Sequence, residues 1–228
     1  MQKNRIKSIC NVLFIATMLA SCSSQEVDNT AGNTNVNSVD NVDNSTSTSQ
    51  STQEFFGSDV SDKNFGMDFS LQSTTGKKIS LHDTQGKVTV LVFGYTHCPD
   101  VCPTNLFTYA NAMEHLGELS KEVQLYFITV DTERDTPDKL GGYVTMFHQS
   151  FIGLVPDDSN LEEVKKAWNI ISNKVPTRDG NYNVDHSAGT YLIDKQGKTA
   201  IYEPHSSTAI QLANDLRLLL TDTAGNAK

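Results

Sequence analysis

The chain has 228 residues and is acidic, with 27 Asp and Glu against 18 Lys and Arg and a formal net charge of -9. No cluster of basic residues follows the first few positions. This charge argues against the phosphate backbone of nucleic acid as a ligand and against electrostatic binding to an anionic membrane.

The first 22 residues have the pattern of an exported protein. Three basic residues, the last of them Lys7, precede an apolar run over residues 9–20. That run is too short to span a bilayer but suits the core of a signal peptide. It is followed by Cys22 in a Leu-Ala-Ser-Cys sequence, which resembles the lipobox of bacterial lipoproteins, where the cysteine is acylated. We predict a signal peptide over residues 1–21 and a periplasm-facing protein of the bacterial cell envelope, anchored in the membrane through lipid on Cys22. An uncleaved anchor, with Cys22 incidental, is the alternative.

Composition divides the rest of the chain into three parts. Loss of the signal peptide removes three positive charges and changes the formal net charge from -9 to -12. Residues 22–53 are polar or small without an aromatic residue, which predicts a disordered tether with an end-to-end distance of roughly 30 Å. Residues 54–222 have the length and composition of one domain with a full hydrophobic core, and residues 223–228 are predicted to be a flexible tail.

The first half of this domain predicts strands around one helix. Alternating residues over 69–81 predict a hairpin with Gly76 in the turn. Continuous apolar runs over 88–93 and 123–130 predict strands covered on both faces, and residues 103–119 between them predict a helix. This order is a βαβ unit with a parallel pair of strands.

The second half begins with a helix whose interior contains two glycines. Thr136 and Pro137 favour a helix start, whereas Gly141 and Gly142 each weaken the helix by about 1 kcal/mol. Ser159 and Glu162 have the spacing of a capping box, and a loop rich in turn residues follows the helix that they start. The predicted elements are a strand over 151–155, a helix over 159–168, a hairpin over 190–202 and a helix over 210–220. The predicted fold class is α/β, with central parallel strands, an antiparallel hairpin at the edge and flanking helices.

Two cysteines, Cys98 and Cys102, directly follow the predicted strand over 88–93. A four-residue step is one helical turn, which brings both sulfurs to one face with Cα atoms about 6 Å apart, within the range of a disulfide. A helix N-terminus lowers a cysteine pKa, and thiolates are soft ligands that suit Cu(I). Because Cys10 leaves with the signal peptide and Cys22 takes lipid, no structural disulfide framework is possible. An oxidising compartment then implies a thiol reductant as a partner. On spacing alone, a redox disulfide and a metal site remain equally open.

Four motifs resemble those of the Sco/SenC family and together cover nearly the whole predicted domain. They are Phe93–Thr104 (FGYTHCPDVCPT), Val130–Pro137 (VDTERDTP), Phe151–Leu154, and Asp185-His186-Ser187 before Tyr191–Asp194. The resemblance implies a thioredoxin-like fold that binds copper, as Cu(I) and Cu(II), through Cys98, Cys102 and His186. It also implies copper loading of cytochrome c oxidase, with the copper-bearing subunit of the oxidase and a periplasmic copper donor as partners. Thr132 departs from the usual Pro of the family, and Gly189 stands where thioredoxins have a cis-proline.

Other side chains near these motifs are weaker candidates. Asp185 is a candidate to orient the His186 ring, with a solvated surface carboxylate as the alternative. His97 is a candidate for a role in metal transfer or in tuning the metal site, and its alternative role is structural. Asp100 is a candidate for capping the helix or for interacting with the helix dipole. Residues 133–135 are interpreted as a solvated, self-paired loop, with docking as the minority alternative.

These patterns predict a metallochaperone rather than an enzyme. The alternative is a thiol-disulfide oxidoreductase that reduces cysteines of the oxidase or of another copper protein without delivering metal. His186 discriminates between the two, because dithiol exchange does not require it. A copper-dependent regulator is a third possibility.

Overall fold

The computed structural model describes residues 54–63, 65–66 and 68–221. The predicted signal peptide, lipidated Cys22 and tether, and the predicted tail over 223–228, lie outside the described residues. Within the described part of the chain, no helix is both long and apolar enough to cross a membrane.

A single eight-stranded sheet forms the centre of the domain, with the order β1-β10-β9-β4-β5-β6-β2-β3. The strands are β1 Ser58–Asp59, β2 Ser70–Ser73, β3 Lys78–Ser80, β4 Val88–Gly94, β5 Val123–Thr129, β6 Ile152–Val155, β9 Thr190–Ile193 and β10 Thr199–Glu203. Strands β4, β5 and β6 are parallel, whereas β9 is antiparallel to β4. Every residue of β4 is buried, as expected for a run of β-branched and aromatic residues in the middle of a sheet.

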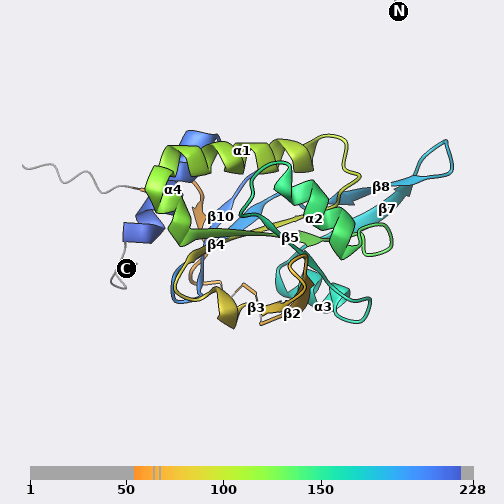
Figure 1. Ribbon diagram of the computed structural model, residues 1–228, viewed down its shortest axis with the longest axis horizontal. Coiled ribbons are helices and arrows are strands. Elements are labelled where there is room, and N and C mark those ends of the chain that lie inside the picture. Colours follow the sequence, from red (N-terminus) through yellow and green to blue (C-terminus); the bar gives the residue numbers. More distant parts are fainter. Residues whose placement is uncertain (1–53, 64, 67, 222–228) are drawn as a thin grey trace, which may run out of the picture. The chain divides into compact units, whose positions relative to one another are not determined.

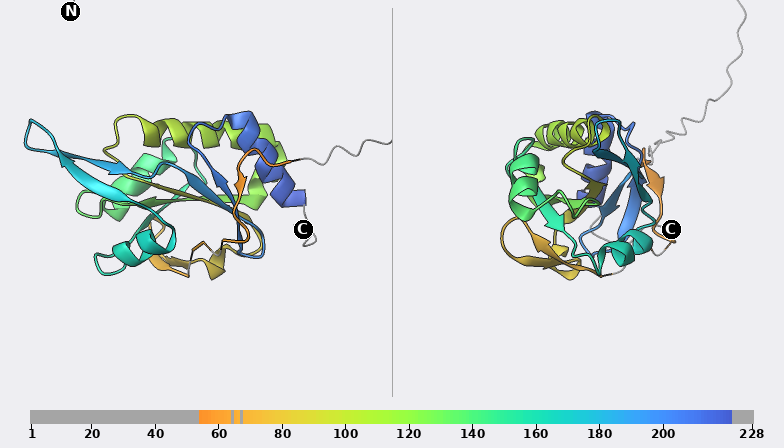
Figure 2. Two further views of the ribbon diagram at one scale, coloured as in Figure 1. Left: turned by 180° about the vertical axis from the view of Figure 1, so that it is seen from behind. Right: turned by 90° about the vertical axis from the view of Figure 1, so that its right-hand side faces the viewer.

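The helices cover both faces of the sheet. Helices α1 Val101–Leu116 and α4 Ala209–Thr221 pack against each other on one face, with α2 Pro137–Thr145 beside α1 (Figure 1). The short helix α3 Leu161–Ala167 lies on the opposite side (Figure 2). The predicted βαβ unit and both predicted hairpins are confirmed, and the fold is the thioredoxin-like α/β fold that the resemblance implied. The two-residue strand β1, which the sequence did not predict, forms the edge next to β10.

The prediction of a loop before residue 190 is wrong, because this segment forms a hairpin of two further strands. Strands β7 Ser172–Pro176 and β8 Tyr182–His186 pair with each other in a separate sheet, and Gly180 in the connecting turn has a φ of 83°. The two strands extend away from the central sheet (Figures 1 and 2). Most of their residues are at least partly exposed, so they lack the apolar alternation that reveals a strand packed on a core.

The helix starts show one correct prediction and two corrections. Thr136 caps α2, since its hydroxyl accepts a hydrogen bond from the Lys139 amide at 3.4 Å. The capping box is wrong, because the Ser159 hydroxyl donates to Asp157 Oδ1 at 2.6 Å and α3 begins only at Leu161. Helix α1 begins two residues earlier than predicted and ends at Leu116, after which residues 117–122 form a 3-10 turn.

Candidate metal centre

The dithiol lies between the end of β4 and the first turn of α1. Cys98 is in the loop before the helix, and Cys102 is the second helical residue, so the prediction that both stand on one helical turn is wrong. The Cys102 amide instead donates to Cys98 Sγ at 3.4 Å, so the sulfur accepts one of the hydrogen bonds that a helix start leaves open. Asp100 is the residue before the helix, but its side chain makes no capping hydrogen bond within the described chain. Among the described residues the structure thus gives Asp100 no capping hydrogen bond, and its alternative role at the positive end of the helix dipole stays a prediction.

His186 reaches the dithiol from the end of β8. Its Nε2 is 3.3 Å from Cys102 Sγ, and the ligand atoms of Cys98, Cys102 and His186 all lie within 4.8 Å of one another. The other ring nitrogen, Nδ1, donates to the carbonyl oxygen of Ser187 at 2.8 Å. That hydrogen bond selects the tautomer in which Nε2 presents a lone pair towards the sulfurs.

The two thiols differ in their surroundings and therefore in their pKa values. The pKa of Cys98 is lowered, chiefly by a hydrogen bond from the Cys102 thiol, against an opposing effect of burial. The pKa of Cys102 is raised, because its proton is held by Cys98 and because the side chain is buried. The pair is therefore poised to share a single proton, with negative charge on the half-buried Cys98.

Two of the candidate residues lie beside the ring and the thiols without contacting either. Asp185 is exposed, and the hydrogen bond that orients the His186 ring comes from the Ser187 carbonyl rather than from Asp185. His97 is exposed, with Nδ1 3.0 Å from Thr96 Oγ1 and 3.9 Å from Asp135 Oδ1. The structure therefore does not bring Asp185 or His97 into contact with the thiol pair.

In the loop after β5, the prediction of a solvated segment over residues 133–135 is confirmed for Glu133, which is exposed, and is wrong for Asp135. Asp131 and Asp135 are each only 1% exposed. Asp135 accepts hydrogen bonds from the Thr96 amide at 3.0 Å and the Thr129 hydroxyl at 2.7 Å. Asp131 is paired with Arg134. Together with His97 these two carboxylates form a second cluster of metal-ligating groups, but both carboxylates already have protein partners.

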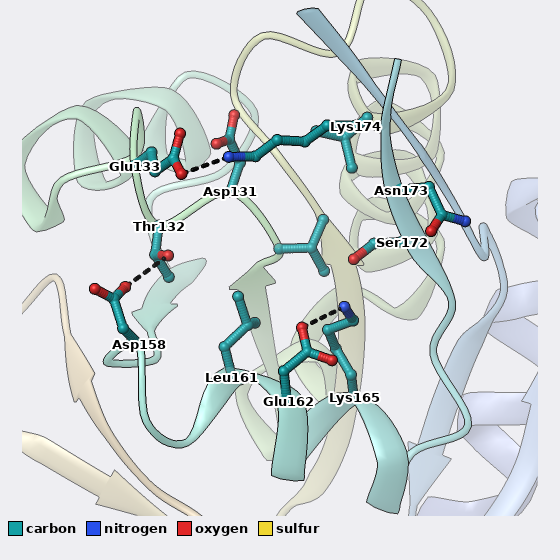
Figure 3. Close-up of a pocket in the computed structure, with 12 residues that line it drawn as sticks. Asp131, Thr132, Glu133, Asp158, Leu161, Glu162, Lys165, Ser172, Asn173 and Lys174 are labelled. Atoms are coloured by element: carbon teal, nitrogen blue, oxygen red, sulfur yellow. Dashed lines mark hydrogen bonds and ion pairs between the residues drawn. The ribbon is translucent and has the colours of Figure 1, made fainter.

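Two cavities lie beside the hairpin. One, of about 330 Å³, is lined by Cys98, His186 and Tyr95 and gives small solutes access to the Cys98 thiol. The other, of about 320 Å³, lies between residues 131–133, helix α3 and the hairpin (Figure 3). Its charged side chains are largely paired, as in the ion pair between Lys174 and Glu133. Val184 lines both cavities, so the hairpin forms the wall between them.

The arrangement supports two kinds of chemistry. Two thiolates and one imidazole form a soft donor set for a copper-like ion, and two neighbouring thiols can close to a disulfide. Sequence reasoning missed Tyr95, Arg134 and Tyr182, which connect the hairpin to the body of the domain. Tyr95 and Arg134 lie inside quoted motifs, but only the fold shows what they contact.

Comparisons with known proteins agree with this geometry. The SCO1/SenC family model matches residues 58–221. A SCO2-like protein of Rickettsia prowazekii is 36% identical over 135 residues, which is 58% of this chain and 66% of that protein. The structure of Bradyrhizobium japonicum ScoI with copper bound is 37% identical and has a TM-score of 0.63, over 67% of this chain and 98% of that one. A lipoprotein of the SCO1/SenC family from Bacillus anthracis is 25% identical with a TM-score of 0.58, over 68% and 95% of the two chains. The chain therefore belongs to the SCO1/SenC family.

Proposed function

We propose that this protein is a copper chaperone that binds copper through Cys98, Cys102 and His186 and assists copper loading of cytochrome c oxidase. The observation that carries the proposal is the convergence of two sulfurs and one imidazole nitrogen within 4.8 Å beside an open cavity. The copper in the Bradyrhizobium japonicum relative supports the choice of metal. The oxidase as target follows from the family resemblance.

The three ligands have different roles in this proposal. Two thiolates suffice for the soft ion Cu(I), whereas the added imidazole allows Cu(II) to bind as well. Copper is the cargo of the protein, which the half-buried Cys98 and the adjoining cavity leave accessible from solution. Oxidation of the pair to a disulfide removes the thiolates and so switches copper binding off.

A copper titration of the reduced protein, with thiols counted before and after, tests this function. One Cu(I) should bind, and Cys98→Ser or Cys102→Ser should abolish stable binding, because one thiolate cannot replace the pair. His186→Ala should retain Cu(I), lose most Cu(II), and still form the disulfide. Stoichiometric Cu(I) on fully oxidised protein without free thiols would place the metal elsewhere.

A thiol-disulfide oxidoreductase remains a second candidate, and the lowered pKa of the accessible Cys98 favours it. The two functions separate at His186, because thiol exchange needs only the dithiol. In cells that lack the wild-type protein, His186→Ala should fail to support oxidase assembly at limiting copper. Full assembly with this variant would reject the chaperone and leave the reductase.

We place the protein at the bacterial cell envelope, facing the periplasm and anchored through lipid on Cys22, with a periplasmic copper donor and a thiol reductant as further partners. The Bacillus anthracis lipoprotein supports the anchor. Cys22→Ser should abolish incorporation of labelled fatty acid and weaken membrane attachment while the domain stays folded. Incorporation by the variant, or none by the wild type, would reject the anchor.

A further inference from the structure

The hairpin that carries His186 is not part of the central sheet. Strands β7 and β8 pair only with each other, so no backbone ladder fixes the distance between the imidazole and the two sulfurs. Apart from the three-residue link between His186 and β9, that distance depends on side-chain contacts between the hairpin and the body of the domain. One of them is the hydroxyl of Tyr95, which accepts a hydrogen bond from the Val184 amide at 3.1 Å.

Arg134 makes a set of contacts that join the loop after β5 to this hairpin. Its Nη1 donates to the carbonyl oxygen of Tyr182 at 2.8 Å and to Asn181 Oδ1 at 3.0 Å. The guanidinium carbon lies 3.7 Å from the centroid of the Tyr182 ring, and the side chain is only 15% exposed. The planar guanidinium fork donates to Asp131 through Nε and to the hairpin through Nη1, while its face stacks on an aromatic ring. A lysine cannot reproduce this combination of contacts.

The same loop also holds the segment that leads to the dithiol. Next to Arg134, the Asp135 carboxylate accepts hydrogen bonds from Thr96, two residues before Cys98. The Tyr182 hydroxyl donates to Asp131 at 2.8 Å, and Lys174 of β7 pairs with Glu133 (Figure 3). This loop therefore contacts both the cysteine-bearing loop and the histidine-bearing hairpin.

Tyr95 connects these contacts to the ligand itself. The Arg134 guanidinium carbon is 5.7 Å from the centroid of the Tyr95 ring. The His186 ring packs edge-on against Tyr95, with 5.8 Å between centroids and an interplanar angle of 83°. A displacement of the hairpin that breaks the Arg134 contacts would therefore also change the packing of the His186 ring against Tyr95.

We propose that Arg134 is a positioning residue, which fixes the β7–β8 hairpin on the domain and thereby holds His186 against the thiol pair. As far as it concerns copper, this inference rests on the proposed function. Arg134 does not touch the ligand atoms and acts through Tyr182, Asn181 and Tyr95. Loss of its fork should therefore impair the imidazole as a ligand and spare the two thiolates.

The test compares Arg134→Lys with Arg178→Lys. Arg178 lies on the same hairpin, is exposed and makes no side-chain hydrogen bond or ion pair with other described residues, so it is a matched control. Arg134→Lys should weaken Cu(II) binding by roughly tenfold, as expected when the partner of a ligand is lost. Cu(I) affinity and the rate of disulfide formation should stay within about twofold of wild type, as should all properties of Arg178→Lys.

A double substitution separates positioning from general destabilisation. In the His186→Ala background, Arg134→Lys should cause no further loss of Cu(II) binding, because the group that it positions is absent. Equal losses in the two backgrounds, or an unchanged Cu(II) spectrum in the single variant, would overturn the proposal.

Measurements on the copper-free protein decide the inference even if the proposed function fails. In NMR spectra, Arg134→Lys should weaken the proton contacts between the Tyr95 and His186 rings. The Val184 amide should exchange with solvent about tenfold faster while amides of β4 keep their protection. Asn181→Ala removes one acceptor of the fork and should move the same signals less far, which provides a second variant if Arg134→Lys does not fold. Unchanged ring contacts and exchange would reject the positioning role, whereas absence of copper binding by the wild type would reject only the chaperone.

Discussion

A glycine at the end of the central strand allows the Cys102 sulfur to lie against the backbone of β4. A methyl group on Gly94 would stand 2.7 Å from Cys102 Sγ and 2.6 Å from Cζ of Phe127. Both neighbours are buried, so neither has free space into which it can move. The absence of a side chain at position 94 thus leaves the space that the Cys102 sulfur occupies.

Gly94→Ala should therefore damage both the core and the dithiol. Overpacking of this kind costs about 1–3 kcal/mol in the free energy of unfolding. Because the sulfur of Cys102 must shift, the rate of disulfide formation should also fall. Urea denaturation and timed thiol counting would measure the two effects. Gly142→Ala is the control, which should leave the rate of disulfide formation unchanged and should not lose stability, since its added methyl group meets no other part of the domain within 4 Å. Wild-type rates and stability would show that the site tolerates the methyl group.

At the scale of elements, helix α2 carries two adjacent glycines that the structure distinguishes. Both lie in the helix interior, where glycine is less favourable than alanine by about 0.5–1 kcal/mol. A methyl group on Gly142 would meet open space, whereas one on Gly141 would stand 3.2 Å from Thr74 Cβ. Packing therefore gives a reason for glycine at position 141 but none at position 142.

Gly142→Ala should stabilise the domain by about 0.5–1 kcal/mol, and Gly141→Ala should give a smaller gain or a loss. The two variants have the same composition, so the difference between their urea midpoints isolates the contact with Thr74. Equal gains would show that Thr74 moves aside at no cost. A loss in Gly142→Ala would mean that the helix needs flexibility at that position.

Most of the elements that the sequence predicted contribute buried residues to the core. Strands β4 and β5 are continuous apolar runs, and the spacing of Cys98 and Cys102 after β4 correctly indicated neighbouring thiols. The β7–β8 hairpin was not predicted, because its strands form hydrogen bonds with each other and most of their residues do not pack in the core. Its Asp-Gly turn at residues 179–180 was the available signal.

His186 shows the limit of sequence reasoning about the site. It lies 84 residues from Cys102 in the chain, and no periodicity relates the two positions. The family resemblance assigned it, and the fold supplies the reason, since β8 ends beside the start of α1. The contacts of Arg134 with that hairpin could not be predicted, because they join segments 48 residues apart in an element that was itself missed.

At the scale of the whole domain, two buried carboxyl groups lie near each other beside the last helix, and one of them holds the first described residues. Asp215 of α4 accepts hydrogen bonds from the amides of Phe56 and Gly57 at 3.0 and 2.8 Å. Glu203, at the end of β10, is 1% exposed and accepts a hydrogen bond from the Ser207 hydroxyl at 2.7 Å. Burial, together with the neighbouring Asp215 carboxylate, raises the pKa of Glu203 to about 8.

This pKa predicts that stability falls as the pH rises. The ordinary value is 4.5 and the folded value is about 8, so between them the folded protein holds a proton on Glu203 that the unfolded chain has lost. The contribution is therefore fully present below about pH 4.5 and is lost as the pH approaches 8, with a slope of at most about 1.4 kcal/mol per pH unit. Glu203→Gln should flatten the slope, because an amide cannot ionise.

Urea denaturation of the reduced, metal-free protein at intervals from pH 5 to pH 9 would measure this slope. Glu118→Gln is the control, because the Glu118 side chain is 90% exposed and its loss should leave the slope unchanged. The other ionisable groups are the same in the wild type and in Glu203→Gln, so the difference between their two curves reports on Glu203. Parallel curves for the wild type and Glu203→Gln would show that Glu203 is ionised in the folded protein at pH 7. In that case the unpaired Glu203 Oε1 would have to be solvated, since none of the described residues gives it a hydrogen-bond partner.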